Sequence, residues 1–306
     1  MSSVFGLPAA PANDLKVLIT IPHFFDPSIK SGYGSTTAPA AERLASLKAC
    51  IQGLQETAGT RQASLLFMHA PAKGRGGNGC LAKVNDFSPS MLDIAVCTTG
   101  ATHLISEDLP PGKSFHHVQT GVQPMRLGLA CHKVLQEMLG KYDYYCYLED
   151  DILLFDPLFF VKLQWFTESF GADALLQPHR FETSGDPALH KLYIDGPVKK
   201  DFSAKWQDIS QANKVVGKTL GRDFFFERPS NPHSGCFFLN ASQMETWAKA
   251  PHFLDGDTSF AGPLESAASL GIMKTFRIYK PAAKSAGFLE IRHLANRYLG
   301  KRLKLR

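Results

Sequence analysis

An apolar, aromatic stretch near the middle of this chain runs directly into three consecutive carboxylates. Tyr144-Tyr145-Cys146-Tyr147-Leu148 precedes Glu149-Asp150-Asp151, and Ile152-Leu153-Leu154-Phe155 follows at once. A stretch of this length and composition is typical of a buried strand. Carboxylates at the end of such a strand lie close to one another and to the low-dielectric core, so they must be paired or must bind a metal ion.

No Lys or Arg lies between Tyr142 and Val161 to pair with these carboxylates. A divalent cation that is held by oxygen ligands and itself carries phosphate oxygens removes the repulsion. The alternative is a solvated acidic turn without chemistry. The cluster alone does not separate the two interpretations, and the rest of the chain favours the metal site.

Apolar segments alternate with helical patterns along the first part of the chain. Strands are expected at residues 17–21, 64–68, 94–98 and 174–178, and helices at 40–54, 127–139 and 159–170. In the first of these helices, apolar residues at Leu44, Leu47, Ile51 and Leu54 define one face. This alternation predicts an α/β fold with a mixed, mostly parallel sheet and helices on both faces.

Ligands of such sheets bind beyond the carboxyl ends of the strands. Pro22, Glu149 and Pro178 end expected strands, so their three loops are expected to share one crevice. His23 and Arg180 follow two of these strands and are candidate contacts to a base or phosphate. Arg180 could neutralise a diphosphate bidentately. Each could equally be a surface group.

The acidic cluster resembles the D-x-D element of GT-A-type glycosyltransferases, and three further segments follow in the order that this superfamily requires. Residues 232–238 resemble the Gly-containing strand that passes near donor and acceptor. Residues 262–268 resemble the acidic helix start that supplies the catalytic carboxylate. His293 matches the late histidine that often completes the metal site. The resemblance spans about residues 15 to 295, and it rests on the order and spacing of short motifs.

The resemblance implies a GT-A-like, Rossmann-related fold that binds a nucleotide-sugar donor together with Mn²⁺ or Mg²⁺. Asp151 and His293 are then the candidate metal ligands, and Glu149 or Asp150 contacts the ribose, the metal or its waters. Gly235 matters through its missing side chain, which lets backbone approach a sugar. A surface histidine for His293 and an ordinary bulge for Gly235 are the alternatives.

Glu265 is the candidate general base, because it follows Gly262-Pro263 at the start of an apolar helix. A carboxylate there can take the proton of an acceptor hydroxyl, which leads to inversion at the anomeric carbon. A first-turn carboxylate also favours the helix dipole, so Glu265 could instead have a purely structural role. Asp255 and Asp257 are competing candidates, and a retaining mechanism stays open.

We expect one domain over residues 1–306. Residues 15–180 form a nucleotide-sugar-binding half, and residues 181–295 form an acceptor and catalytic half. The polar region at 181–231 is interpreted as an insertion that faces the acceptor, with an exposed excursion as the alternative. Residues 292–306 alternate apolar with basic side chains and predict a basic amphipathic helix. That helix could touch an anionic membrane or pack on the core.

The net charge of +5 suits anionic ligands and falls short of the concentrated charge of a nucleic-acid binder. Residues 1–13 lack the basic and apolar regions of a signal peptide, and no apolar run approaches membrane-spanning length. We therefore expect a cytoplasmic protein with possible peripheral contact at the inner face of the cell membrane.

The leading hypothesis is a metal-dependent glycosyltransferase that moves a sugar from a nucleotide donor to a hydroxyl of a saccharide or glycoconjugate. A nucleotidyltransferase of the same fold is the alternative enzyme. Against it, no Gly-rich loop bearing Lys or Arg follows the first strand directly. A non-catalytic protein that binds carbohydrate or metal is the alternative from another class.

Overall fold

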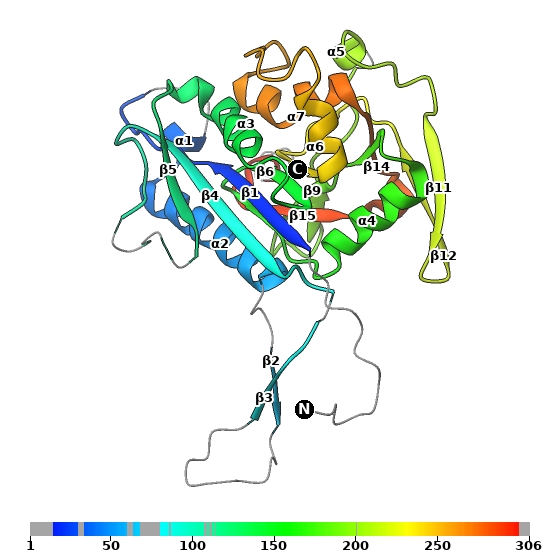
Figure 1. Cartoon of the computed structure of the whole chain (residues 1–306), viewed down its shortest axis with the longest axis horizontal. Coiled ribbons are helices and arrows are strands. Elements are labelled where there is room, and N and C mark those ends of the chain that lie inside the picture. Colours follow the sequence, from blue (N-terminus) through cyan, green and yellow to red (C-terminus); the bar gives the residue numbers. More distant parts are fainter. Residues whose placement is uncertain are drawn as a thin grey trace.

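A five-stranded central sheet organises the chain (Figure 1). The computed structural model describes residues 15–29, 34–59, 64–67, 80–85, 87–106, 109, 112, 114–199 and 201–299. The strand order is β13-β6-β1-β4-β5. Four strands are parallel: β1 (Lys16–Pro22), β4 (Met91–Thr99), β5 (His116–Thr120) and β6 (Tyr144–Leu148). The edge strand β13 (Cys236–Asn240) runs antiparallel to β6.

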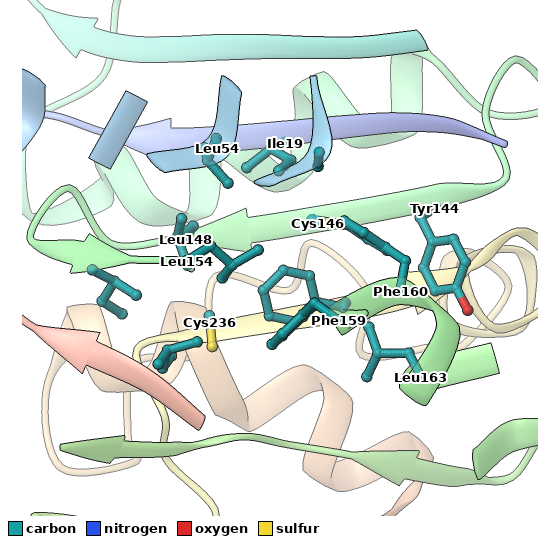
Figure 2. Packing of buried hydrophobic residues seen from close by; sticks show 14 of the residues in the cluster. Ile19, Leu54, Tyr144, Cys146, Leu148, Leu154, Phe159, Phe160, Leu163 and Cys236 are labelled. Carbon is teal, nitrogen blue, oxygen red and sulfur yellow. The ribbon is translucent and has the colours of Figure 1, made fainter. Parts of the chain in front are cut away.

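Helices cover both faces of this sheet, as the period of two along its strands requires. Ile19 and Cys146 face the side that packs against α2 (Ala40–Ala58) and α4 (Phe159–Phe170); Figure 2 shows this layer, with Leu54 and Phe159 among its members. Leu18 and Tyr145 face the opposite side. There they pack with apolar residues of α3 (Leu127–Glu137), α6 (Ala241–Ala248) and α7 (Pro263–Thr275).

Smaller sheets join segments that are distant in the sequence. One has the order β10-β9-β15-β7, formed by Lys191–Tyr193, His179–Thr183, Glu290–His293 and Ile152–Leu153. Another has the order β11-β12-β14-β8, formed by Lys214–Thr219, Arg222–Glu227, Arg277–Pro281 and Ala174–Leu176. A third pairs β2 (Ser64–Phe67) with β3 (Cys80–Lys83), which extend away from the other sheets in Figure 1.

The short elements are α1 (Gly34–Thr37), α5 (Asp201–Ala204) and two 3₁₀ turns, η1 (Pro124–Arg126) and η2 (Ala283–Phe288). Because β9 pairs with β15 and β8 pairs with β14, strands of the two predicted halves hydrogen-bond to each other. Because four strands of the central sheet are parallel and helices cover both faces, the predicted α/β class and mostly parallel central sheet are confirmed. Among the helices of the described ranges, none combines the length and the apolar character needed to cross a membrane.

The prediction of a C-terminal helix beginning at Arg292 is wrong. Arg292 and His293 belong to β15, whose edges are both hydrogen-bonded, to β7 and to β9, and this pairing overrides the amphipathic pattern. Residues 297–299 are helical. The remaining part of the predicted helix, residues 300–306, lies outside the described residues.

Candidate functional site

The site lies where the order of the central sheet reverses. From β1 the chain continues to β4 and β5 on one side, and it returns to β6 on the other side of β1. Loops that leave two such neighbouring parallel strands diverge and open a crevice at their carboxyl ends. Pro22 at the end of β1 and Glu149 after β6 both line a cavity of about 430 Å³ at this point.

Most of the residues that the sequence singled out meet in this cavity. They come from the end of β1, the turn between β6 and β7, β9, α7 and β15: Pro22, Glu149, Asp150, Asp151, Arg180, Glu265 and His293. The competing carboxylates Asp255 and Asp257 are not part of the lining, and they pair with Lys274 at 3.4 and 2.8 Å. None of the described residues between 181 and 231 lines the cavity, and the acceptor-facing insertion stays a prediction.

Asp150 turns away from any ligand and into a buried polar cluster. Its oxygens Oδ1 and Oδ2 lie 2.5 and 2.6 Å from Nη2 of Arg43, and Oδ2 lies 2.6 Å from Nδ1 of His23. The backbone N–H of Leu104 donates to Nε2 of His23, so Nδ1 carries the imidazole proton and donates to Asp150. Burial opposes ionisation of Asp150, but Arg43 and His23 outweigh it and hold its pKa below the usual value.

His23 is therefore not a contact to base or phosphate. Its side chain has no exposed surface and is absent from the cavity lining. Asp150 does border the cavity, yet both of its oxygens already accept hydrogen bonds. Two of the three carboxylates, Glu149 and Asp151, are left to face a ligand.

Glu149 occupies the space that a side chain at Gly235 would need. A Cβ added at Gly235 would lie 2.7 Å from Oε2 of Glu149, and the backbone φ of Gly235 is +65°. The predicted approach of a sugar to Gly235 is corrected, because the glycine admits Glu149 and does not line the cavity. Burial raises the pKa of Glu149 to about 7 against the opposing charge of Arg180, and the charges of Asp151 and Glu265 add to the rise.

Arg180 is a buried charge that lines the cavity, and its contact with a diphosphate stays a prediction. Its Nε and Nη2 donate to Oδ1 of Asp195 at 3.0 and 2.9 Å, which occupies one side of the guanidinium. Asp195 is fully buried beside Lys280, at 3.3 Å from its Nζ. Nη1 of Arg180 remains and lies 3.9 Å from Oε2 of Glu149. Arg180 thus supplies positive charge beneath Glu149.

His293 reaches the acidic turn because β15 pairs with β7, with His293 opposite Ile152. Nδ1 of His293 lies 2.8 Å from Oε1 of Glu182, and Nε2 lies 3.6 Å from Oδ2 of Asp151. Burial alone would lower the pKa of His293, but the hydrogen bond to Glu182 and the charge of Asp151 raise it. Oδ1 of Asp151 is buried and makes no hydrogen bond.

These two side chains fit a divalent cation that arrives with an anionic ligand. Within the described ranges, no three His, Cys, Asp or Glu side chains come close enough together to hold a metal ion by themselves. Asp151 offers a carboxylate with an unpaired oxygen, and Glu182 orients Nε2 of His293 toward it. Mg²⁺ is commonly bound by one or two carboxylates together with substrate phosphates and water, so a partial protein site suffices.

Glu265 lies in the first turn of α7, where Gly262 precedes the helix and Pro263 occupies its first position. Its side chain lines the cavity, and its Oε2 is buried without a hydrogen-bond partner. An unpaired carboxylate oxygen can accept the proton of a hydroxyl that enters the cavity. The start of α7 is as the sequence predicts, whereas the sequence could not show that Oε2 of Glu265 has no hydrogen-bond partner.

The sequence reasoning missed the groups that hold the acidic turn in place. Arg43 and Glu182 bind cavity residues that are 107 and 111 positions away in the sequence, and Asp195 binds Arg180 across 15 positions. His233 lines the cavity, with Nε2 3.9 Å from Oε1 of Glu149, and burial keeps its pKa well below the usual value. Only Arg43 carried a sequence signal: it lies four residues before Leu47, on the buried face of α2.

No protein-family model matches this chain and no curated protein matches it, so the geometry of the cavity alone bears on function.

Proposed function

We propose that this protein is a GT-A-type, metal-dependent glycosyltransferase that moves a sugar from a nucleotide-sugar donor to a hydroxyl of a saccharide or glycoconjugate. One observation carries the proposal. A single cavity at the switch point of the sheet contains an acid–histidine pair, Asp151 and His293, and a separate carboxylate, Glu265, with an unpaired oxygen. Asp151 and His293 suit a diphosphate with its cation, and Glu265 suits the role of proton acceptor.

At the donor end, Asp151 and His293 would hold Mn²⁺ or Mg²⁺. A bound cation of this kind stabilises the negative charge that develops on a leaving diphosphate. Glu149, with a pKa of about 7, is partly protonated at neutral pH and can donate or accept a hydrogen bond with a ribose hydroxyl. Arg43 contacts Asp150 and Arg180 lies beside Glu149, which keeps these two carboxylates in one arrangement.

At the acceptor end, Glu265, whose side chain lines the cavity, would take the proton of the attacking hydroxyl. Apolar side chains, including Met125, Leu127 and Leu264, line the same cavity. A base on the acceptor and a leaving group on the opposite side of the anomeric carbon together give inversion.

Calorimetric titration with UDP, GDP, TDP and CMP species, with and without Mn²⁺, tests the donor end. The proposal expects one nucleotide series to bind only when the metal is present. If no nucleotide shows metal-dependent binding, both enzyme hypotheses fail. The sugar nucleotide of the series that binds is then incubated with saccharide acceptors. Release of the nucleoside diphosphate supports glycosyl transfer, release of pyrophosphate supports a nucleotidyltransferase, and binding without turnover supports a binding protein.

A further inference from the structure

Glu182 joins two parts of the chain that border the cavity. The residue lies on β9, and its side chain has no exposed surface. Oε1 accepts hydrogen bonds from Nδ1 of His293 at 2.8 Å and from the backbone N–H of Tyr298 at 3.3 Å. Oε2 accepts from the backbone N–H of Leu299 at 2.6 Å. One carboxylate therefore orients a candidate metal ligand and also anchors the helical turn at residues 297–299.

The turn presents two side chains to the cavity. Arg297 and Tyr298 both line it, and Tyr298 is 47% exposed although its backbone is tied to a buried carboxylate. The Tyr298 ring centroid lies 6.2 Å from that of His293. Nη2 of Arg297 lies 3.3 Å from Oγ1 of Thr37, so the turn reaches a segment 260 residues away in the sequence. Leu299, at 2% exposure, packs into the interior.

Because the backbone of the turn makes the anchoring hydrogen bonds, the hydroxyl of Tyr298 and the N–H groups of Arg297 that do not contact Thr37 are available to a ligand. An exposed aromatic ring on a cavity wall offers a flat surface for a sugar or a base. A guanidinium at the same wall suits phosphate oxygens. Both lie on the side of the cavity that contains His293, which is the donor end of the proposed reaction.

We propose that Glu182 is a positioning residue that makes the C-terminal turn part of the donor site, with Tyr298 packing on the sugar or base and Arg297 contacting the diphosphate. The inference rests on the proposed function for the identity of the ligand. Since Glu182 holds both His293 and the turn, a substitution of Glu182 should affect metal binding and the contacts of Arg297 and Tyr298 with the ligand. A substitution of Arg297 or Tyr298 should affect only the contacts with the ligand.

Three variants separate these effects: Glu182→Gln, Tyr298→Leu and Arg297→Gln. Gln at position 182 keeps one accepting oxygen but places an NH₂ group against donors that now meet a carboxylate. Glu290→Gln is the matched control, because Glu290 lies on β15, accepts from Lys191 and Tyr193, and does not line the cavity. The probes are Mn²⁺ alone, followed by electron paramagnetic resonance, and Mn²⁺ with UDP, GDP or pyrophosphate, followed by calorimetry.

Glu182→Gln should lower the affinity for Mn²⁺ alone by about tenfold, as changes behind a metal-bound histidine usually do, and should lower the affinity for the metal–nucleotide complex as well. Tyr298→Leu and Arg297→Gln should leave the affinity for Mn²⁺ alone unchanged. They should weaken the metal–nucleotide complex by about three- to tenfold, the effect of one lost stacking or charged contact. Glu290→Gln should match the parent in every assay. Hydrogen exchange at the amides of Tyr298 and Leu299 should accelerate in Glu182→Gln alone.

The proposal is overturned if the parent binds the metal–nucleotide complex and both turn variants bind it equally well. It is also overturned if a folded Glu182→Gln protein binds the metal–nucleotide complex as tightly as the parent does. If Glu182→Gln does not fold, the two exposed turn variants decide the question by themselves.

A parent that binds pyrophosphate with Mn²⁺ but no nucleotide contradicts the glycosyltransferase proposal. A loss of pyrophosphate affinity in Arg297→Gln then still supports the turn as part of the site, and an unchanged affinity overturns it. A parent that binds neither probe overturns both proposals.

Discussion

Arg43 and Asp150 lie 107 residues apart in the sequence and form a buried ion pair, in which Nη2 of Arg43 contacts both carboxylate oxygens at 2.5 and 2.6 Å. Because of this pair, the carboxylate of Asp150 in the turn after β6 points into the protein, whereas those of Glu149 and Asp151 do not. Asp150 is fixed to α2 and to His23 at the end of β1. Glu149 and Asp151 consequently face the cavity in a defined arrangement.

Arg43→Met should destabilise the protein by about 3 kcal/mol, because it leaves Asp150 buried without its main charged partner. Urea unfolding of the metal-free protein measures the change. The double variant Arg43→Met with Asp150→Asn removes both charges and should recover most of the loss. If Arg43→Met alone costs less than about 0.5 kcal/mol, as an exposed pair would, the pair does not anchor the turn.

The sequence could predict the central sheet and the end of β6 because local patterns determine them. A run of apolar and aromatic residues that ends in carboxylates is typical of a buried strand that reaches a polar edge of its sheet. The partners of those carboxylates could not be predicted in the same way. Arg43 and Arg180 come from α2 and β9, and pairing across such distances depends on the packing of the whole fold. The absence of nearby Lys or Arg in the sequence therefore did not mean an absence of neutralising charge.

Gly235→Ala should destabilise the protein by about 1–3 kcal/mol and displace Glu149. The left-handed φ of +65° is strained for alanine, and the new Cβ would lie 2.7 Å from Oε2 of Glu149. Thermal unfolding and metal-dependent nucleotide binding should both deteriorate. Gly185→Ala is the control, because a Cβ there meets nothing within 4 Å. Parent-like unfolding and nucleotide binding in Gly235→Ala would show that Glu149 does not depend on this glycine.

Glu149→Gln should change how stability depends on pH. In the folded protein burial raises the pKa of Glu149 to about 7 from its usual 4.5, so the folded state keeps a proton that the unfolded state loses. This group therefore costs the parent stability as the pH rises from about 4.5 to 7, and the cost is constant above that range. The unfolding free energy of Glu149→Gln minus that of the parent should grow across this range by at most about 3 kcal/mol. Metal-free urea titrations from pH 4.5 to 8 give this difference, and a flat profile would contradict the raised pKa.

The C-terminal part of the site shows a second limit of sequence reasoning. The alternation of basic and apolar residues from Arg292 onward is typical of an amphipathic helix. Arg292 and His293 are nevertheless part of β15, because this strand pairs with neighbours on both sides. The same pairing brings His293 to Asp151. Glu182 carried no signal, because a single carboxylate on a short strand reveals its partners only when β9 and β15 are placed side by side.

Asp151→Ala should abolish Mn²⁺-dependent nucleotide binding while the protein stays folded. The variant removes one of two candidate metal donors. It loses the contacts of Oδ2 with Arg43 and His293 but relieves repulsion with Glu149, so the metal-free protein should stay folded. Calorimetry with Mn²⁺ and the nucleotide that the parent binds measures the effect. Asp173→Ala, at an exposed surface ion pair with Arg277, is the control. If Asp151→Ala binds that nucleotide as tightly as the parent, the acidic turn is structural and the metal assignment fails.

Glu265→Gln and His293→Ala should have opposite effects, which separates the proposed base from the metal ligand. Gln keeps the shape of Glu265 but cannot accept the acceptor's proton, so turnover should fall by about 10²- to 10⁴-fold while donor and metal affinity stay nearly unchanged. His293→Ala should weaken metal-dependent donor binding first. Donor affinity from calorimetry and transfer rate under single-turnover conditions measure both variants, with the exposed Glu245→Gln as control. Near-normal turnover in Glu265→Gln would remove Glu265 as the base. Asp255 and Asp257 could not readily replace it, because both pair with Lys274 away from the cavity, and a retaining mechanism would then become the leading hypothesis.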